Sequence, residues 1–175
     1  MSLKSIRLFP DPGLSKPCEP VKKFDRELLK LIEDLWDTLY HSPGVGLAAP
    51  QIGVSEQVSV IDTKRSFSKR NRDAASNRQI ILINPVITET EGVQVPREGC
   101  LSVPDWLANV RRFERVVIQN QSPEGRGEYL EGKGFEALAL QHEVDHLQGK
   151  LFMDRVMDLK TDLFRRQTYR KDNSK

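Results

Sequence analysis

The residues best suited to chemistry lie near the C-terminus, in the segment Gln141-His142-Glu143-Val144-Asp145-His146. This segment fits the pattern H-E-x-x-H, within a stretch that reads as helical. Histidines four residues apart on a helix project from one face, so both imidazoles can bind a single metal ion. Glu143 then lies close enough to handle a proton on a water molecule bound to that ion. The pattern therefore predicts a metal-dependent hydrolase.

A catalytic metal site usually has three protein ligands and a water, so a third ligand must come from elsewhere in the chain. Cys100 is the best candidate because it lies in the segment EGCLSVP at 98–104. Gly99 allows an unusual backbone path there and Pro104 stiffens the exit, so a thiolate could be held rigidly.

The other candidates are Cys18, His41 and the many carboxylates. Cys18 lies in a predicted coil with no second ligand nearby, and we interpret it as a small apolar residue. His41 follows a predicted helix end, where an imidazolium is favourable without any metal.

Three segments together resemble the motifs of the peptide deformylase family. They are GVGLAAPQIG at 44–53, EGCLSVP at 98–104 and QHEVDH at 141–146, in the order found in that family. The resemblance implies that Cys100, His142 and His146 hold the metal ion.

The same resemblance assigns the catalytic roles. It implies that Glu143 is the catalytic glutamate and that Gln51 and the Leu101 backbone N–H stabilise an oxyanion. The family removes the N-formyl group from the initiator methionine of nascent bacterial or organellar proteins, which is hydrolysis of an amide to formate and an amine. Glu143 would accept a proton from metal-activated water and pass it to the leaving amine. Loss of one oxyanion donor would cost roughly 3 kcal/mol.

The glycine-rich segment suits a formyl group for a steric reason. A formyl carbon carries only hydrogen, so the backbone near Gly46 can close around it, whereas an acetyl group should fit poorly. The candidate substrate-binding residues are Val45, Gly46, Leu47, Phe135, Leu138 and Ala139. For Phe135 and Leu138 the helical spacing fits a methionine pocket and the protein core equally well. Glu98 and Asp145 are expected to orient the histidines through hydrogen bonds.

The resemblance also implies the cofactor and the partners. The family typically uses Fe²⁺, with Zn²⁺, Ni²⁺ or Co²⁺ substituting, and a Cys-His-His set accepts several such ions. The substrates would be N-formylmethionyl nascent peptides. A basic C-terminal helix containing Arg165, Arg166, Arg170 and Lys171 could contact ribosomal phosphates.

Several elements must position these residues. Asp25 is a candidate N-cap of a helix that reaches about Tyr40, with Leu28, Ile32, Leu35 and Leu39 on one stripe. The segment 44–53 is too rich in Gly and Pro for a regular element. Strands are predicted at 58–61, 80–83, 110–119 and 129–130, with a turn at 122–125. A helix is predicted from Phe135 to about Gly149, and a last helix from about Asp158.

This order lacks βαβ alternation and favours an α+β fold, with mostly antiparallel sheets packed around a central metal-binding helix and with N-terminal and C-terminal helices. We expect one catalytic domain over 1–175, a flexible basic loop at 64–78 and a C-terminal helix and tail at 158–175.

Composition adds only broad constraints. The chain has 175 residues, is 38% hydrophobic and 30% charged, and has a net charge of +2, which gives no overall attraction to DNA or membranes. Residues 1–10 contain Lys4 and Arg7 and do not resemble a signal peptide, so a bacterial cytoplasm is expected. Two cysteines cannot form a disulfide framework.

Two other functions use similar residues. A zinc peptidase also uses H-E-x-x-H, but such enzymes usually take a downstream Glu or His as third ligand, and no histidine follows His146. A structural metal site would need four protein ligands, whereas the sequence offers three convincing ones with a general base beside them.

Overall fold

The computed structural model describes residues 3–65 and 78–166. Its helices are α1 (Arg26–Tyr40) and α2 (Gly134–Leu147), with short 3₁₀ helices that include η1 (Pro12–Ser15), η2 (Ala49–Ile52), η3 (Thr63–Arg65) and η6 (Phe152–Arg155). Its strands are β1 (Gly46–Ala48), β2 (Val58–Asp62), β3 (Gln79–Ile83), β4 (Val86–Glu91), β5 (Arg97–Cys100), β6 (Val103–Asn109), β7 (Arg115–Gln121), β8 (Gly127–Lys133) and β9 (Leu163–Arg165).

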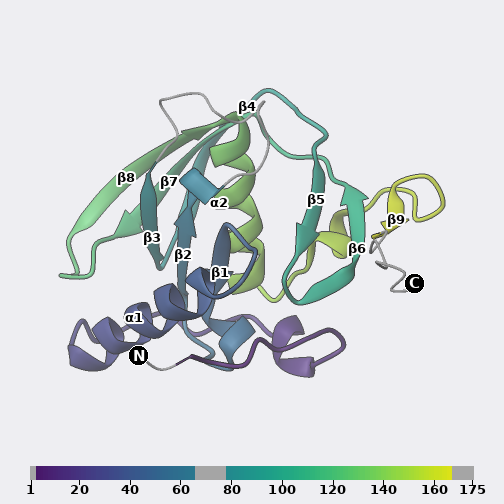
Figure 1. The fold of residues 1–175 in the computed structure, drawn as a ribbon. Coiled ribbons are helices and arrows are strands. Elements are labelled where there is room, and N and C mark those ends of the chain that lie inside the picture. Colours follow the sequence, from purple (N-terminus) through teal and green to yellow (C-terminus); the bar gives the residue numbers. More distant parts are fainter. Residues whose placement is uncertain (1–2, 66–77, 167–175) are drawn as a thin grey trace.

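The strands form three antiparallel sheets, in the orders β1-β2-β3, β4-β7-β8 and β5-β6-β9. Figure 1 shows α2 in the middle of the molecule, with the β5-β6-β9 sheet on one side and the other two sheets on the opposite side. The α+β class, the antiparallel sheets and the central helix are therefore confirmed.

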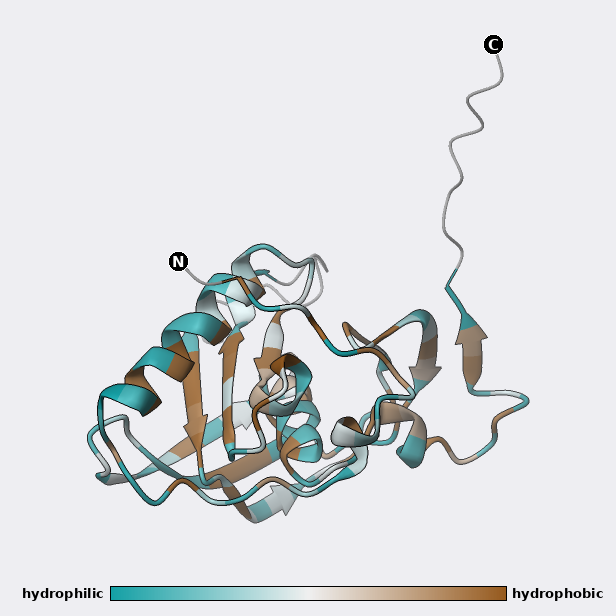
Figure 2. Ribbon diagram, turned by 90° about the horizontal axis from the view of Figure 1, so that it is seen from below, coloured by the Kyte–Doolittle hydropathy of each residue, from teal (hydrophilic) through white to brown (hydrophobic). Residues whose placement is uncertain are grey.

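Helix α1 forms where its pattern predicts. The Asp25 side chain accepts hydrogen bonds from the backbone N–H groups of Glu27 and Leu28, which caps the first turn. Its apolar stripe packs on β1, β2 and β3, where Leu35 and Leu39 are fully buried. Figure 2 shows this stripe facing the strands, with the polar face of α1 turned outward. Each buried leucine contributes about 1.5–3 kcal/mol relative to an exposed one.

Helix α2 is buried on nearly every side, and its apolar residues Ala137, Leu140 and Val144 pack against β2, β3 and β7. It ends at Leu147, and Gly149 follows with a φ of 71°. A Cβ at Gly149 would lie 2.6 Å from the backbone carbon of Lys16, so glycine is required there for both space and conformation. A helix this buried can aim polar side chains at a site that excludes water.

Two sequence predictions need correction, one of an irregular segment and one of a strand. The glycine-rich segment 44–53 is regular in part, because β1 pairs with β2, with Gly46 opposite Ile61, and continues into η2. The predicted strand at 110–119 is broken between β6, which ends at Asn109, and β7, which begins at Arg115. The break arises because the chain passes from one sheet to another there and turns Arg112 inward.

The predicted C-terminal helix from Asp158 is wrong for the residues that the structure describes. A turn over 159–161 leads into β9, which pairs with β6 so that Leu163 lies opposite Ala108 and Phe164 opposite Leu107. Pairing with β6 satisfies backbone groups that a helix would satisfy internally, and it lets Leu163 pack on the core next to β6. Residues 167–175 lie outside the described part.

The predicted basic loop at 64–78 is described only at its two ends. Lys64 and Arg65 belong to η3, and Arg78 donates to the Glu136 carboxylate and the Glu131 carbonyl. The remaining residues of that prediction, 66–77, lie outside the described part.

Candidate metal centre

The structure brings the three predicted metal ligands together. Cys100 ends β5, while His142 and His146 lie one turn apart on α2, and one ligand atom from each lies within 4.8 Å of the others. The Cys100 Sγ is 3.2 Å from His146 Nε2, and the two imidazole rings meet edge to face with centroids 4.9 Å apart. One thiolate and two imidazoles form a suitable set for a first-row divalent ion.

The electrostatics favour a thiolate at Cys100. Burial raises the pKa of this thiol, but the neighbouring His146 and His142 outweigh burial and hold the pKa well below 9.0. Burial lowers the pKa of His142, but its interactions with Cys100 and Glu98 prevail and raise that pKa well above 6.5. A thiolate that exists at neutral pH is the form that binds a metal cation.

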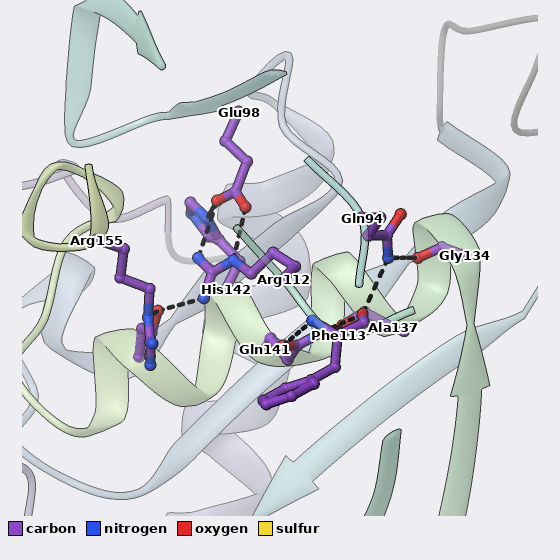
Figure 3. Close-up of polar contacts among 10 residues, drawn as sticks. Gln94, Glu98, Arg112, Phe113, Gly134, Ala137, Gln141, His142 and Arg155 are labelled. Carbon is purple, nitrogen blue, oxygen red and sulfur yellow. Dashed lines mark hydrogen bonds and ion pairs between the residues drawn. The ribbon is translucent and has the colours of Figure 1, made fainter. Parts of the chain in front are cut away.

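A buried carboxylate fixes the orientation of His142. The His142 Nδ1 donates to Glu98 Oε2 at 2.8 Å, so Nε2 is the ring nitrogen that could bind a metal once it has lost its proton. Arg112 donates to the same carboxylate through Nε at 2.6 Å and Nη2 at 2.9 Å, as Figure 3 shows. Burial raises the pKa of Glu98, but the bonds from Arg112 and His142 prevail and lower it to about 2.

The predicted role of Glu98 in orienting a histidine is therefore supported by geometry, whereas Asp145 has different partners. Asp145 accepts from Arg112 Nη1 at 2.5 Å and from Arg155 Nε and Nη2 at 2.5 Å each. Hydrogen bonds through Arg112 and Glu98 link it to His142.

Sequence reasoning missed Arg112, although a signal was present. Val110 and Arg112 are both buried while Arg111 between them is exposed, as expected for alternation along extended chain. An arginine at an inward position requires a buried acid, and Glu98 and Asp145 supply two.

Glu143 lies beside the ligands and against the glycine-rich segment. Its side chain is buried, and a Cβ at Gly46 would lie 2.2 Å from Glu143 Oε1, so only glycine allows this approach. Within residues 3–65 and 78–166, Glu143 Oε2 has no hydrogen-bond partner. Burial raises the pKa of Glu143 to about 7 against the opposing charges of His146 and His142.

Gln51 lies on η2 with its carboxamide fixed at both ends. Its Oε1 accepts from the Ala48 backbone N–H at 2.8 Å, and its Nε2 donates to Ser102 Oγ at 3.0 Å. The same Nε2 is 3.5 Å from Cys100 Sγ. A fixed amide donor therefore lies next to Cys100, a candidate metal ligand. Ser102, which sequence reasoning did not single out, helps to hold it there.

The predicted substrate-binding residues differ in where their side chains lie. Leu47 is fully buried in the core beneath α1, and Ala139 is buried between α2 and the sheets. Any contact from Leu47 to a substrate would therefore come from its backbone. Leu138 is 9% exposed, and Val45, Gly46 and Phe135 are half-buried. Leu138 lies one turn before His142 on the same side of α2, and Phe135 nearly one turn before Leu138.

The other cysteine lies apart from this group. Cys18 packs with Ala48 and Leu147, and burial raises the pKa of its thiol to about 11, so it stays protonated at neutral pH. Within the described chain, the grouped ligand atoms are those of Cys100, His142 and His146, and no fourth residue completes a structural site.

Comparison with known proteins gives a consistent result. The sequence model of the family described as polypeptide deformylase matches residues 3–162. The peptide deformylase of Acidobacterium capsulatum is 44% identical over 167 residues, or 95% of this chain and 94% of that protein. The crystal structure of peptide deformylase from Thermotoga maritima has a TM-score of 0.80 at 38% identity, covering 90% of this chain and 100% of its own. The Met-Ala-Ser-bound class I type b peptide deformylase of Acinetobacter baumannii has a TM-score of 0.81 at 31% identity, covering 89% and 99%.

Proposed function

This chain belongs to the polypeptide deformylase family, and we propose that it removes the N-formyl group from formylmethionyl nascent peptides by means of one metal ion, Glu143 and Gln51. The observation that carries this proposal is the meeting of a Cys-His-His ligand set with a buried glutamate and a fixed amide donor. A metal site with an acid–base group and an oxyanion donor is equipped for amide hydrolysis.

The residues present fit a divalent metal ion. Three donor atoms converge, Cys100 is favoured as a thiolate, and Glu98 directs His142 so that Nε2 is available. When bound, a divalent ion supplies Lewis acidity and lowers the pKa of water from about 15.7 toward about 7. By family resemblance we propose Fe²⁺ as the ion used in cells, with Zn²⁺, Ni²⁺ and Co²⁺ as substitutes.

Glu143 is proposed to move the proton in this reaction. Its Oε2 lacks a partner in the described chain, so this oxygen can accept a proton from attacking water and return it to the leaving amine nitrogen. A pKa of about 7, raised by burial, matches such a two-way role near neutral pH.

Gln51 and Leu101 are proposed to stabilise the developing oxyanion. The Gln51 amide is held by Ala48 and Ser102 before substrate arrives, so little reorganisation is needed to donate to that oxygen. The Leu101 backbone N–H follows Cys100 directly and would supply the second donor.

Selectivity for a formyl group is proposed to come from Gly46 and its neighbour Val45. Glu143 fills the space that a Cβ at Gly46 would need. Gly46 and Glu143 therefore leave little room for the methyl of an acetyl group. Phe135, Leu138 and Ala139 are proposed to contact the methionine side chain. The Met-Ala-Ser bound to the Acinetobacter baumannii relative supports a peptide of this kind as the ligand.

The setting of the reaction also remains a proposal. We propose that the reaction takes place in a bacterial cytoplasm. No helix of the described chain has the length and apolarity needed to cross a membrane. Ribosome contact is proposed for the basic C-terminal residues Arg165, Arg166, Arg170 and Lys171. Ribosome binding that is unchanged after deletion of 158–175, which removes all four cations, would argue against it.

The function is tested by formate release from formyl-Met-Ala-Ser by protein loaded anaerobically with ferrous iron, with acetyl-Met-Ala-Ser as the matched substrate. We expect rapid release from the formyl peptide and little hydrolysis of the acetyl peptide. Absence of formate at full metal occupancy, or cleavage of internal peptide bonds instead, would reject deformylation and favour a peptidase.

A further inference from the structure

Arg65 makes a set of contacts that its place in a basic, polar stretch does not predict. Its Nε donates to the Gly44 carbonyl at 2.9 Å, and its Nη2 donates to the Ser42 carbonyl at 2.5 Å. The guanidinium carbon also lies 5.3 Å from the centroid of the Tyr40 ring, over the last turn of α1. One side chain thus holds two carbonyls of the loop that connects α1 to β1.

This loop touches the proposed active site at two points. A Cβ at Gly44 would lie 2.6 Å from Leu101 Cδ1, and Gly46 lies against Glu143. Between them, the Val45 carbonyl accepts from the Asp62 backbone N–H at 2.7 Å. Strand β2 therefore fixes the middle and end of the loop, whereas Arg65 fixes its beginning.

The geometry suits an arginine in particular. A planar guanidinium can donate to two carbonyls while its face rests on an aromatic ring, which a lysine ammonium cannot do. The positive charge also lies near the C-terminus of α1, where the helix dipole favours a cation. Tyr40 is itself held, because Gln79 donates to its hydroxyl and that hydroxyl donates to Asp62 Oδ2 at 3.3 Å.

We propose that Arg65 is a positioning residue, which holds residues 42–46 against Leu101 and Glu143 and so sets the opening that receives the formylated end of the substrate. This inference rests on the proposed function. Arg65 does not touch the reacting atoms, so its loss should weaken substrate binding more than it slows the chemical step.

The test compares Arg65→Ala and Arg65→Lys with Lys64→Ala, which removes the neighbouring, exposed cation. We expect Arg65→Ala to raise the KM for formyl-Met-Ala-Ser roughly tenfold, as expected for lost charge-assisted hydrogen bonds, with kcat changed less than about threefold. Arg65→Lys should fall between Arg65→Ala and wild type, and Lys64→Ala should match wild type.

Amide hydrogen exchange of residues 42–46 gives a second readout that does not depend on activity. We expect faster exchange there in Arg65→Ala, with unchanged exchange in α2. Unchanged KM together with unchanged exchange at 42–46 would overturn the inference, and so would equal effects from Lys64→Ala. Wild-type protein without formate release would reject the proposed function, while faster exchange in Arg65→Ala would still support the hold of Arg65 on the loop.

Discussion

A buried carboxylate can hold a histidine ring in place by ionic hydrogen bonding only while it stays ionised, and Glu98 depends on Arg112 for its charge. Burial alone would raise the pKa of Glu98 and favour its protonated form. The two hydrogen bonds from Arg112 to Glu98 reverse that effect. The remaining nitrogen of the guanidinium, Nη1, donates to the Asp145 carboxylate. Such a buried network contributes little net stability but is costly to break at one point.

The first prediction concerns this carboxylate. Glu98→Gln keeps the size of the side chain but removes the charge that balances Arg112, so the orientation of His142 should loosen. We expect the affinity for metal to fall about 10- to 100-fold, measured by competition with a chelator of known affinity. Glu33→Gln on the exposed face of α1 serves as the control. Metal affinity within about twofold of wild type in Glu98→Gln would contradict the role assigned to Glu98.

Most of the metal centre can be predicted from sequence at this scale, for a physical reason. The spacing of His142 and His146 is local, so helix geometry alone brings them together. The pairing of Cys100 with these histidines is not local; the context of Cys100 made it the best candidate, and the family resemblance implied the full ligand set. Arg112 and Ser102 were missed because their roles depend on partners distant in the chain.

Among the elements, α1 and β9 show where sequence patterns succeed and fail. Helix α1 has a cap, a stripe and 15 residues, so its local signals agree with one another. Strand β9 has three residues and depends on β6 for its hydrogen bonds. Its formation therefore depends on the rest of the fold, which a pattern of three residues cannot reveal. The break between β6 and β7, within the predicted strand 110–119, also depends on contacts with the rest of the fold, so the local pattern did not reveal it.

The second prediction concerns β9. Deletion of residues 163–175 should uncover the edge of β6 and remove the packing of Leu163 and the contact of Phe164 with Arg97, whose guanidinium carbon lies 4.1 Å from the Phe164 ring centroid. We expect the free energy of unfolding in urea to fall by about 1–3 kcal/mol. Deletion of 167–175 alone is the control, and it should leave the free energy of unfolding unchanged. Equal stability of the two truncated proteins would show that β9 adds nothing measurable.

At the scale of the whole molecule, the three sheets are arranged around α2. One candidate metal ligand comes from the β5-β6-β9 sheet and two come from α2, so a bound ion would link that sheet to the helix on which the other sheets pack. Figure 1 shows α2 between the β5-β6-β9 sheet and the other two sheets.

The third prediction follows from that linkage. An ion that binds only the folded protein stabilises it in proportion to the logarithm of its concentration over Kd. Removal of metal with a chelator should therefore lower the Tm, and replacement of Cys100 by Ser should reduce the size of this change. A Tm that is independent of metal would indicate that the ion does not link the β5-β6-β9 sheet to α2.

The central claim is that the metal ligands and Glu143 have separate roles, the former in binding the ion and the latter in moving a proton. It is tested most directly by measuring metal content and formate release on the same samples of wild type and Glu143→Gln. We predict equal metal content, with formate release from formyl-Met-Ala-Ser reduced about 10²- to 10⁴-fold in the variant. Near wild-type release by metal-loaded Glu143→Gln would contradict the account.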